Sequence, residues 1–220
     1  MRNFCLAAAL VGSAVAPSAF GVINPFTEDF SLNASGWTNF NNSAPLSYFG
    51  AGGPNNSNYV SGSFNFVSQA ANATPVIVRG EGGFSGGAFN GNWITSGVTT
   101  MTVWVRHNAP QPLSYFARMA QTPFPGAIAV AFAPVAPNTW TPLSFAINAS
   151  SPQFINFEQS DFATVFSNIS RIQFGVMVPQ ALAGVDQGFT FDFDRVAIVP
   201  APGALALVGL AALGAARRRR

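Results

Sequence analysis

The stretch VTTMTVWVRH, residues 98–107, decides the fold class. Met101, Val103 and Val105 alternate with Thr, Trp and Arg side chains, which is the period of two that a half-buried β-strand requires. An amphipathic helix would instead place its apolar residues three or four positions apart. The stretch therefore predicts a strand with one face in a core and the other face outside it.

The same alternation recurs along the chain. It is found in SGSFNFV (61–67), GAIAVAFAP (126–134), WTPLSFAIN (140–148), RIQFGVMV (171–178) and FTFDFDRVAIV (189–199). Turn-rich segments such as GEGGFSGG (80–87) separate these runs. One segment, SDFATVFSN (160–168), has helical spacing instead, and we expect a short helix capped by Ser160. The sequence predicts an all-β protein, an antiparallel two-sheet sandwich of the jelly-roll type with one short helix.

The charges are few and unevenly placed. Only 8% of the residues are charged, and every basic residue is an arginine. Residues 21–200 contain five arginines and all eight acidic residues, a net charge of −3, whereas the whole chain carries +2 because of arginines at its two ends. A mildly acidic body argues against nucleic acid as a partner.

The first twenty residues, MRNFCLAAALVGSAVAPSAF, have the pattern of a secretory signal peptide: one arginine, an apolar helical run and then small residues. We expect a signal peptide over residues 1–19 and export by the secretion machinery. The only cysteine, Cys5, lies within it, so the body over residues 20–198 is expected to contain no disulfide.

The chain ends with VPAPGALALVGLAALGAARRRR, residues 199–220. As a helix, its apolar run 203–216 would span about 21 Å, which is short of the ~30 Å hydrocarbon core of a bilayer. We expect a transmembrane-like helix that holds the protein in the membrane only transiently. The terminal arginines would remain on the cytoplasmic side.

A signal peptide combined with this tail resembles the bacterial PEP-CTERM sorting-domain proteins. The residues that carry the resemblance are Val199, Pro200, Ala201, Pro202, Arg217, Arg218, Arg219 and Arg220. Ala201 stands where the usual motif has Glu. The resemblance implies that residues 199–220 are a sorting segment recognised by an exosortase, a membrane enzyme that cuts near the motif. It also implies a location at the cell surface, or in the extracellular polysaccharide matrix, of a Gram-negative, biofilm-forming bacterium.

The body resembles carbohydrate-binding and laminin-B-like jelly rolls. The stretches that carry this resemblance are FTEDFSLNASGW (26–37), SDFATVFSNISRIQFGV (160–176) and FDFDRVAI (191–198). Arg195 departs from the pattern, because Asn or Asp is usual at its position. The resemblance implies ligand binding or adhesion rather than catalysis.

A glycan site is expected on strand faces that do not enter the core. The candidate residues are Trp104, Arg106, Arg118, Arg171 and Gln173. An exposed Trp can stack on a sugar ring, and planar Arg and Gln side chains can bond its hydroxyl groups. The alternative is that Trp104 packs beneath a loop or a helix. Trp37, Trp93 and Trp140 lie near strand ends and are expected in the core.

A structural calcium site is the second candidate. Glu28 and Asp29 lie at the start of the body, and Asp192 and Asp194 lie in its last strand. The two ends of a jelly roll usually run close together, so a hard cation bound by these carboxylates would join them. The alternative is that these acidic side chains face solvent or bond to turns. No other cofactor is expected.

The sequence offers few residues in the arrangements that catalysis requires. His107 is the only histidine and has no evident nucleophile partner. Asp192 and Asp194 would lie about 7 Å apart on one strand face, a spacing seen in glycosidases, but neighbours on one strand seldom flank a substrate. The remaining acids, Glu81, Glu158, Asp161 and Asp186, are expected in loops.

We therefore assign no catalytic residue and expect an exported, non-enzymatic glycan-binding or adhesive protein that contacts extracellular polysaccharide. Two alternatives remain: a purely structural matrix protein without a specific ligand, and a polysaccharide-acting hydrolase.

Overall fold

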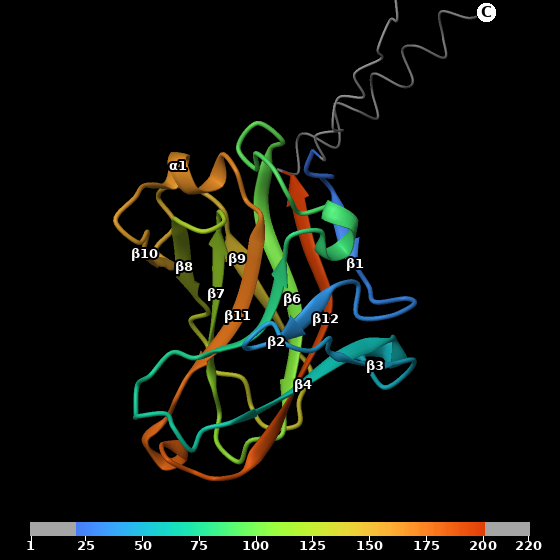
Figure 1. Ribbon diagram of the computed structural model, residues 1–220, viewed down its shortest axis with the longest axis vertical. Helices are drawn as coiled ribbons and strands as arrows, with labels where there is room; N and C mark the ends of the chain where they lie inside the picture. The colour runs from blue at the N-terminus through green and yellow to red at the C-terminus, as the bar shows by residue number, and fades with distance from the viewer. Residues whose placement is uncertain (1–20, 201–220) are drawn as a thin grey trace, which may run out of the picture.

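The computed structural model describes residues 21–200; the expected signal peptide and residues 201–220 lie outside this range. The described residues fold into two antiparallel sheets packed face to face, as Figure 1 shows. The predicted all-β sandwich is therefore confirmed. None of the helices within residues 21–200 has the length and hydropathy that a membrane span needs.

Sheet A has the strand order β3-β4-β12-β6-β9, and β1 pairs with the second half of β12. Its strands are β1 (Phe26–Glu28), β3 (Ser47–Phe49), β4 (Tyr59–Asn65), β6 (Val98–His107), β9 (Thr141–Ala146) and β12 (Gly188–Pro200). The strand β6 has the bounds of the stretch from which the fold was predicted. Because β1 and β12 are neighbours, the start and the end of the body lie side by side, as the jelly-roll prediction requires.

Sheet B has the strand order β10-β8-β7-β11-β5-β2. Its strands are β2 (Trp37–Asn39), β5 (Val76–Glu81), β7 (Ser114–Ala120), β8 (Gly126–Val130), β10 (Phe154–Asn156) and β11 (Arg171–Met177). Three short 3-10 helices, η1 (Pro54–Asn56), η2 (Phe84–Gly87) and η3 (Gln180–Leu182), lie in the connections.

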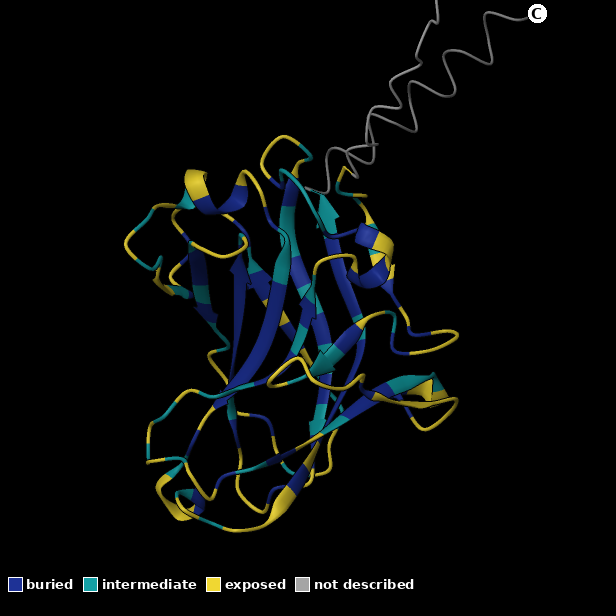
Figure 2. Cartoon of the chain, viewed as in Figure 1, coloured by how far each residue is buried: buried dark blue, intermediate teal, exposed yellow. Residues whose placement is uncertain are grey.

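The core lies between the sheets and is rich in aromatic rings. Phe189, Phe191 and Phe193 of β12 are at most 2% exposed. Trp37 stacks on Phe174 within sheet B, and Phe174 stacks in turn on Phe193 of sheet A, with ring centroids 5.9 and 5.6 Å apart. Each fully buried ring of this kind contributes about 1.5–3 kcal/mol to folding. Figure 2 shows the result, buried strands enclosed by exposed loops.

The predicted helix is present as α1 (Phe162–Phe166), but its cap differs from the prediction. Asp161, not Ser160, is the N-cap, and its carboxylate accepts a hydrogen bond from the backbone N–H of Thr164 at 2.8 Å. Asp161 has the extended backbone that an N-cap requires. Its side chain accepts the N–H of Thr164, the third helical residue, which has no carbonyl partner within the helix. Val165 and Phe166 are the buried residues of the helix.

In β8 it is the smaller residues that face the core. Ala127 and Ala129 are fully buried in the core, whereas Ile128 and Val130 are only partly buried. Just beyond the strand, Phe132 is 69% exposed. The outer face of sheet B therefore carries large apolar side chains.

Candidate functional site

The outer face of sheet B is built in rows that the strand register aligns. In β11, Ile172 and Phe174 point into the core, so Gln173 between them points outward. Gln173 lies opposite Arg118 of β7 on one side and opposite Arg79 of β5 on the other. Three planar polar side chains thus stand next to one another across three strands.

Arg118 is the centre of a fixed hydrogen-bond network. Its Nε and Nη2 atoms donate to the two carboxylate oxygens of Glu158, the second bond being 2.6 Å long. Its Nη1 atom donates to Oε1 of Gln173 at 2.9 Å. Arg118 and Gln173 are only 9% and 3% exposed, so these bonds lie in a recess where water screens them weakly.

On the same face of the sheet, the network continues across the strands to Glu81 at the end of β5. Nε2 of Gln173 donates to Oε1 of Glu81 at 3.2 Å. The same oxygen pairs with Nε of Arg171 at 3.0 Å and with Nη1 of Arg79 at 3.1 Å. Polar groups therefore form an unbroken line from the loop that carries Glu158 to β5.

Two local features place the Arg118–Glu158 pair. Gly126 leaves room for the guanidinium group, since a Cβ atom at this position would lie 2.9 Å from Cζ, Nε and Nη2 of Arg118. Glu158 sits in the left-handed region with φ of 50°, and its backbone N–H donates to Oδ1 of Asn156 at 2.6 Å. The bond from Arg118 is the main cause that lowers the pKa of Glu158 below its ordinary 4.5.

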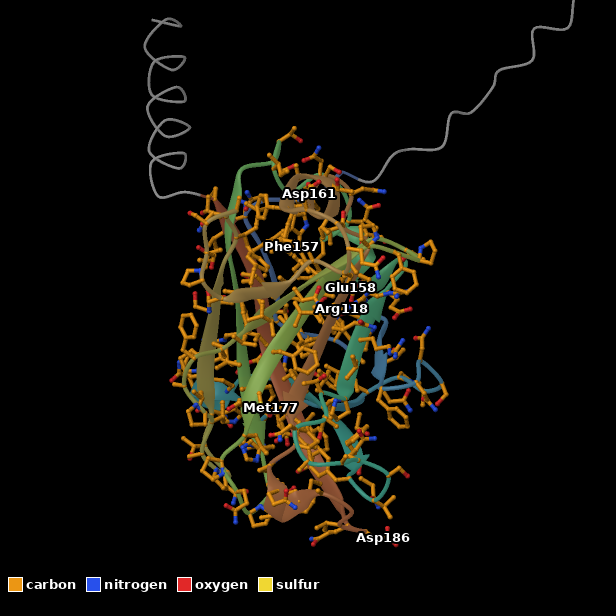
Figure 3. The ribbon with its side chains drawn as sticks, turned by 90° about the vertical axis from the view of Figure 1, so that its left-hand side faces the viewer. Arg118, Phe157, Glu158, Asp161, Met177 and Asp186 are labelled. Carbon is orange, nitrogen blue, oxygen red and sulfur yellow. The ribbon has the colours of Figure 1, made fainter. Side chains whose placement is uncertain are left out.

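An exposed aromatic ring stands beside this network. Phe124 is 70% exposed, and the Arg118 guanidinium carbon lies 6.0 Å from the centre of its ring. Phe124, Asn156, Glu158 and Gln159 line an open recess. Figure 3 shows Arg118 and Glu158 close together, with Met177 well below them.

The lower part of the same face is a cavity of about 500 Å³ with a mainly apolar lining. Its principal lining residues are Val76, Phe116, Ile128, Phe132, Ile155 and Met177. The Phe116 ring packs closely over Gly175 of the neighbouring strand. A Cβ atom at Gly175 would lie only 2.3 Å from this ring, so the position requires glycine. Arg118 belongs to the lining as well, so the cavity and the polar network share a wall.

The five residues predicted to bind glycan are divided between the two outer faces. Arg118, Arg171 and Gln173 come together on sheet B. Trp104 and Arg106 belong to β6 of sheet A instead.

On sheet A, Arg106 contacts two aromatic rings and a carboxylate. Its guanidinium carbon lies 5.1 Å from the Tyr59 ring centre and 4.7 Å from that of Trp140. Its Nε donates to Oδ2 of Asp192 at 2.7 Å. Trp140 was expected in the core and is partly exposed here instead, because its indole N–H donates to the Gly52 carbonyl of an outer loop. Trp37 and Trp93 are buried as predicted.

Asp192 and Asp194 do not form an acid/base pair in this structure. Asp192 is bound to Arg106. Asp194 is fully buried, where it accepts hydrogen bonds from the Ser57 hydroxyl and from the Arg195 backbone N–H, both 2.6 Å long. Burial is the main cause that raises the pKa of Asp194.

The predicted calcium site is not confirmed by the arrangement of its four carboxylates. The chain ends do meet, but Glu28 accepts the backbone N–H of Phe30 at 2.9 Å and Asp29 that of Ser31 at 3.1 Å. Within residues 21–200 there is no group of three or more His, Cys, Asp or Glu side chains that could hold a metal ion. The carboxylates are used for turns and for the bonds of Asp192 and Asp194.

His107 is the last residue of β6 and is fully buried. Its Nε2 lies 3.0 Å from the Val135 carbonyl, and burial lowers its pKa. Its ring is 6.2 Å from those of Tyr115 and Phe191, which belong to the core.

The site residues that sequence reasoning missed are Glu81, Glu158, Arg79 and Phe124. Glu158 was expected in a loop and lies in one, but its partner Arg118 is forty positions away. Glu81 was expected in a loop and instead ends β5. For Phe124, the local signal is its place in the proline-rich segment TPFP, residues 122–125, which is typical of a turn.

Of the predicted sorting residues, Val199 and Pro200 are described, and both belong to β12, opposite Thr100 and Val98. Ala201, Pro202, the apolar run and the four terminal arginines lie outside the described residues.

No family model and no curated protein matches this chain. Among solved structures, the chain is similar to the CBM22-1 and GH10 modules of Clostridium thermocellum endo-1,4-β-D-xylanase 10B, complexed with xylohexaose. The TM-score is 0.50 at 17% identity, over 79% of this chain and 28% of that one. An exo-β-agarase matches with a TM-score of 0.52 at 10% identity, over 82% of this chain and 26% of that one.

A family 11 carbohydrate-binding module from C. thermocellum, in complex with a mixed-linked tetrasaccharide, gives a TM-score of 0.45 at 10% identity, over 82% of this chain and 98% of that one. Of the xylanase and agarase chains described above, this chain spans little more than a quarter of the length. At these identities the likeness concerns the fold alone, which is that of an antiparallel β-sandwich.

Proposed function

We propose that the outer face of sheet B binds a glycan, and that the protein is a non-catalytic module that attaches to extracellular polysaccharide. The observation that carries the proposal is the network from Glu158 through Arg118 and Gln173 to Glu81, beside the exposed ring of Phe124. The network combines donors and acceptors in fixed positions with an aromatic surface, which is what a hydroxyl-rich ring with apolar C–H faces requires.

The network is suited to binding because its side chains are already ordered. Arg118, Gln173 and Glu81 hold one another in place through bonds of 2.9 and 3.2 Å, so little side-chain entropy remains to be lost when a ligand arrives. The three arginines and two glutamates of the face nearly balance in charge. A neutral sugar fits this balance better than a polyanion does.

The similar structures suggest the first probes, since one is complexed with xylohexaose and the other is an exo-β-agarase. The test is a binding array that carries xylo-, agaro- and mixed-linked β-gluco-oligosaccharides and matrix polysaccharides, probed with the full exported protein. We expect binding to at least one neutral glycan, without its turnover. Absence of binding throughout the panel would support a structural matrix protein without a ligand, and turnover would support the hydrolase alternative.

We further propose that residues 1–19 direct export, and that residues 199–220 direct exosortase-dependent sorting to the cell surface or the extracellular matrix. The support is the sequence of the two ends, including the motif Val199-Pro200-Ala201-Pro202 and the arginine cluster. The intact mass of the extracellular form tests this. We expect a mass that lacks both ends, and a mature protein that retains Arg220 would contradict sorting by cleavage.

A further inference from the structure

The apolar half of the sheet B face is a cavity rather than a flat surface. Its volume of about 500 Å³ lies within the usual range of small-ligand pockets. Phe132 and Ile155 in its lining are 69% and 64% exposed, so folding leaves large apolar groups in water at this place. Apolar surface that remains exposed beside polar groups is typical of a binding site.

The cavity is continuous with the proposed sugar site. Arg118 lines the cavity and is the centre of the polar network. Asn156 lines both the cavity and the recess beside Phe124. Along β7, Phe116 is two residues from Arg118, which places the apolar and polar rows about 7 Å apart. A sugar ring on the polar row would therefore hold a substituent directly above the cavity.

Arg118 has donors to spare at the boundary between the two halves. A guanidinium group has five N–H donors. Three of these bond to Glu158 and Gln173. Two N–H groups remain for a ligand acceptor at the edge of an apolar cavity. A carbonyl oxygen joined to a hydrocarbon group matches this combination of donor and apolar surface.

We propose that the cavity receives an ester-linked acyl group carried by the bound glycan, with the ester carbonyl accepting a hydrogen bond from Arg118. The ligand class is thus an acylated glycan. This inference rests on the proposed function, because the sugar must occupy the polar half. Each additional CH₂ group buried in the cavity strengthens binding about fourfold until the cavity is filled.

The test measures the affinity of the full chain for xylohexaose, agarohexaose and a mixed-linked β-glucan tetrasaccharide, each in free, O-acetylated and O-butyrylated form. For the sugar that binds, we expect the butyryl form to bind most tightly and the free form most weakly. Equal affinity of the three forms would overturn the acyl proposal and leave the glycan proposal intact. Absence of binding by every form would overturn both. Methyl butyrate binding as tightly as the butyrylated sugar would overturn the glycan-linked ligand class.

Ile155→Ser is the cavity variant and Leu32→Ser the matched control, since both side chains are exposed and aliphatic and Leu32 lies in a loop away from the cavity. We expect Ile155→Ser to remove most of the preference for the butyryl form and to leave the affinity for the free sugar unchanged. Leu32→Ser should keep the preference. Phe132→Ser should behave like Ile155→Ser. Retention of the full preference by both cavity variants, with unchanged melting temperatures, would contradict the proposal.

Discussion

Arg118 of β7 and Glu158 of the loop before α1 form a two-bond ion pair on the outer face of sheet B, although forty positions separate them in the chain. The pair turns a loop carboxylate and a strand guanidinium into one rigid unit. Both are largely shielded from solvent: the side chain alone is 11% exposed in Arg118 and 20% exposed in Glu158.

Gly126→Ala is expected to weaken glycan binding while the fold persists. The added Cβ would displace the Arg118 guanidinium from a distance of 2.9 Å, and the far end of a flexible side chain can move without unfolding the strand. Loss of one charged hydrogen bond to the ligand corresponds to about tenfold weaker binding or more. Titration calorimetry of the variant measures the loss.

Gly83→Ala is the control for that substitution, because a Cβ atom at Gly83 meets nothing within 4 Å and its φ is −87°. It should bind like the wild type. If Gly126→Ala bound equally well, the position of the Arg118 guanidinium would not matter for the ligand.

The Glu158 carboxylate should make stability depend on acid pH. Its bond to Arg118 lowers its pKa below 4.5 in the folded state. The stabilisation is therefore complete above pH 4.5 and is lost as the pH falls through the lower folded-state pKa. We expect Glu158→Gln to melt below the wild type at pH 7 and the difference to shrink towards pH 3. A difference that stays constant between pH 7 and pH 3 would show that the carboxylate charge plays no part.

Ser57→Ala is expected to destabilise the protein most strongly at neutral pH. The Ser57 hydroxyl donates at 2.6 Å to the buried carboxylate of Asp194, whose pKa is already raised by burial. Removal of the donor raises that pKa further and should cost about 1.5–3 kcal/mol when the carboxylate is charged. A drop in melting temperature of several degrees is expected at pH 7.

The same loss should become smaller as the pH falls towards the raised pKa of Asp194, because a protonated carboxyl group needs the donor less. Thermal melts of the wild type and of Ser57→Ala, recorded at several pH values from neutral pH downwards, test whether the loss in melting temperature shrinks on acidification. A loss that increases on acidification would contradict the assignment.

Phe124→Ala should reduce glycan affinity with little effect on stability. The ring is 70% exposed, so its removal costs the folded core almost nothing. An aromatic contact is worth about 0.5–1.5 kcal/mol, which corresponds to an affinity loss of roughly twofold to tenfold. Phe49→Ala, which removes a 43% exposed ring from sheet A, is the matched control and should leave the affinity unchanged. Equal affinities of the two variants would remove Phe124 from the site.

The alternating runs predicted β4, β6, β8, β9, β11 and β12, because alternation is a local property, whereas the other six strands carry no such run. Met101, Val103 and Val105 are all fully buried, as their spacing requires. Alternation also indicated that Arg106 leaves the core, and Arg118 was expected on an outer strand face as well, but neither expectation says to which sheet a strand belongs. The two arginines consequently lie on opposite outer faces, and the predicted glycan site is divided.

The remainder of the site depends on register and on loop geometry, which the sequence does not display. Gln173 meets Arg118 only because β11 and β7 pair in one particular register. Glu158 reaches Arg118 because Glu158 and Gln159 both adopt positive φ, with values of 50° and 64°, in a loop without a glycine to mark the turn.

The most direct test of glycan binding by sheet B compares Arg118→Gln with Arg106→Gln on the same oligosaccharide. Each arginine pairs with one carboxylate, but the two lie on opposite outer faces of the sandwich. We expect Arg118→Gln to weaken binding by about tenfold or more, because it removes charged hydrogen bonds at the site, and Arg106→Gln to bind like the wild type. A larger loss for Arg106→Gln, or equal losses for the two variants, would contradict the assignment of the site to sheet B.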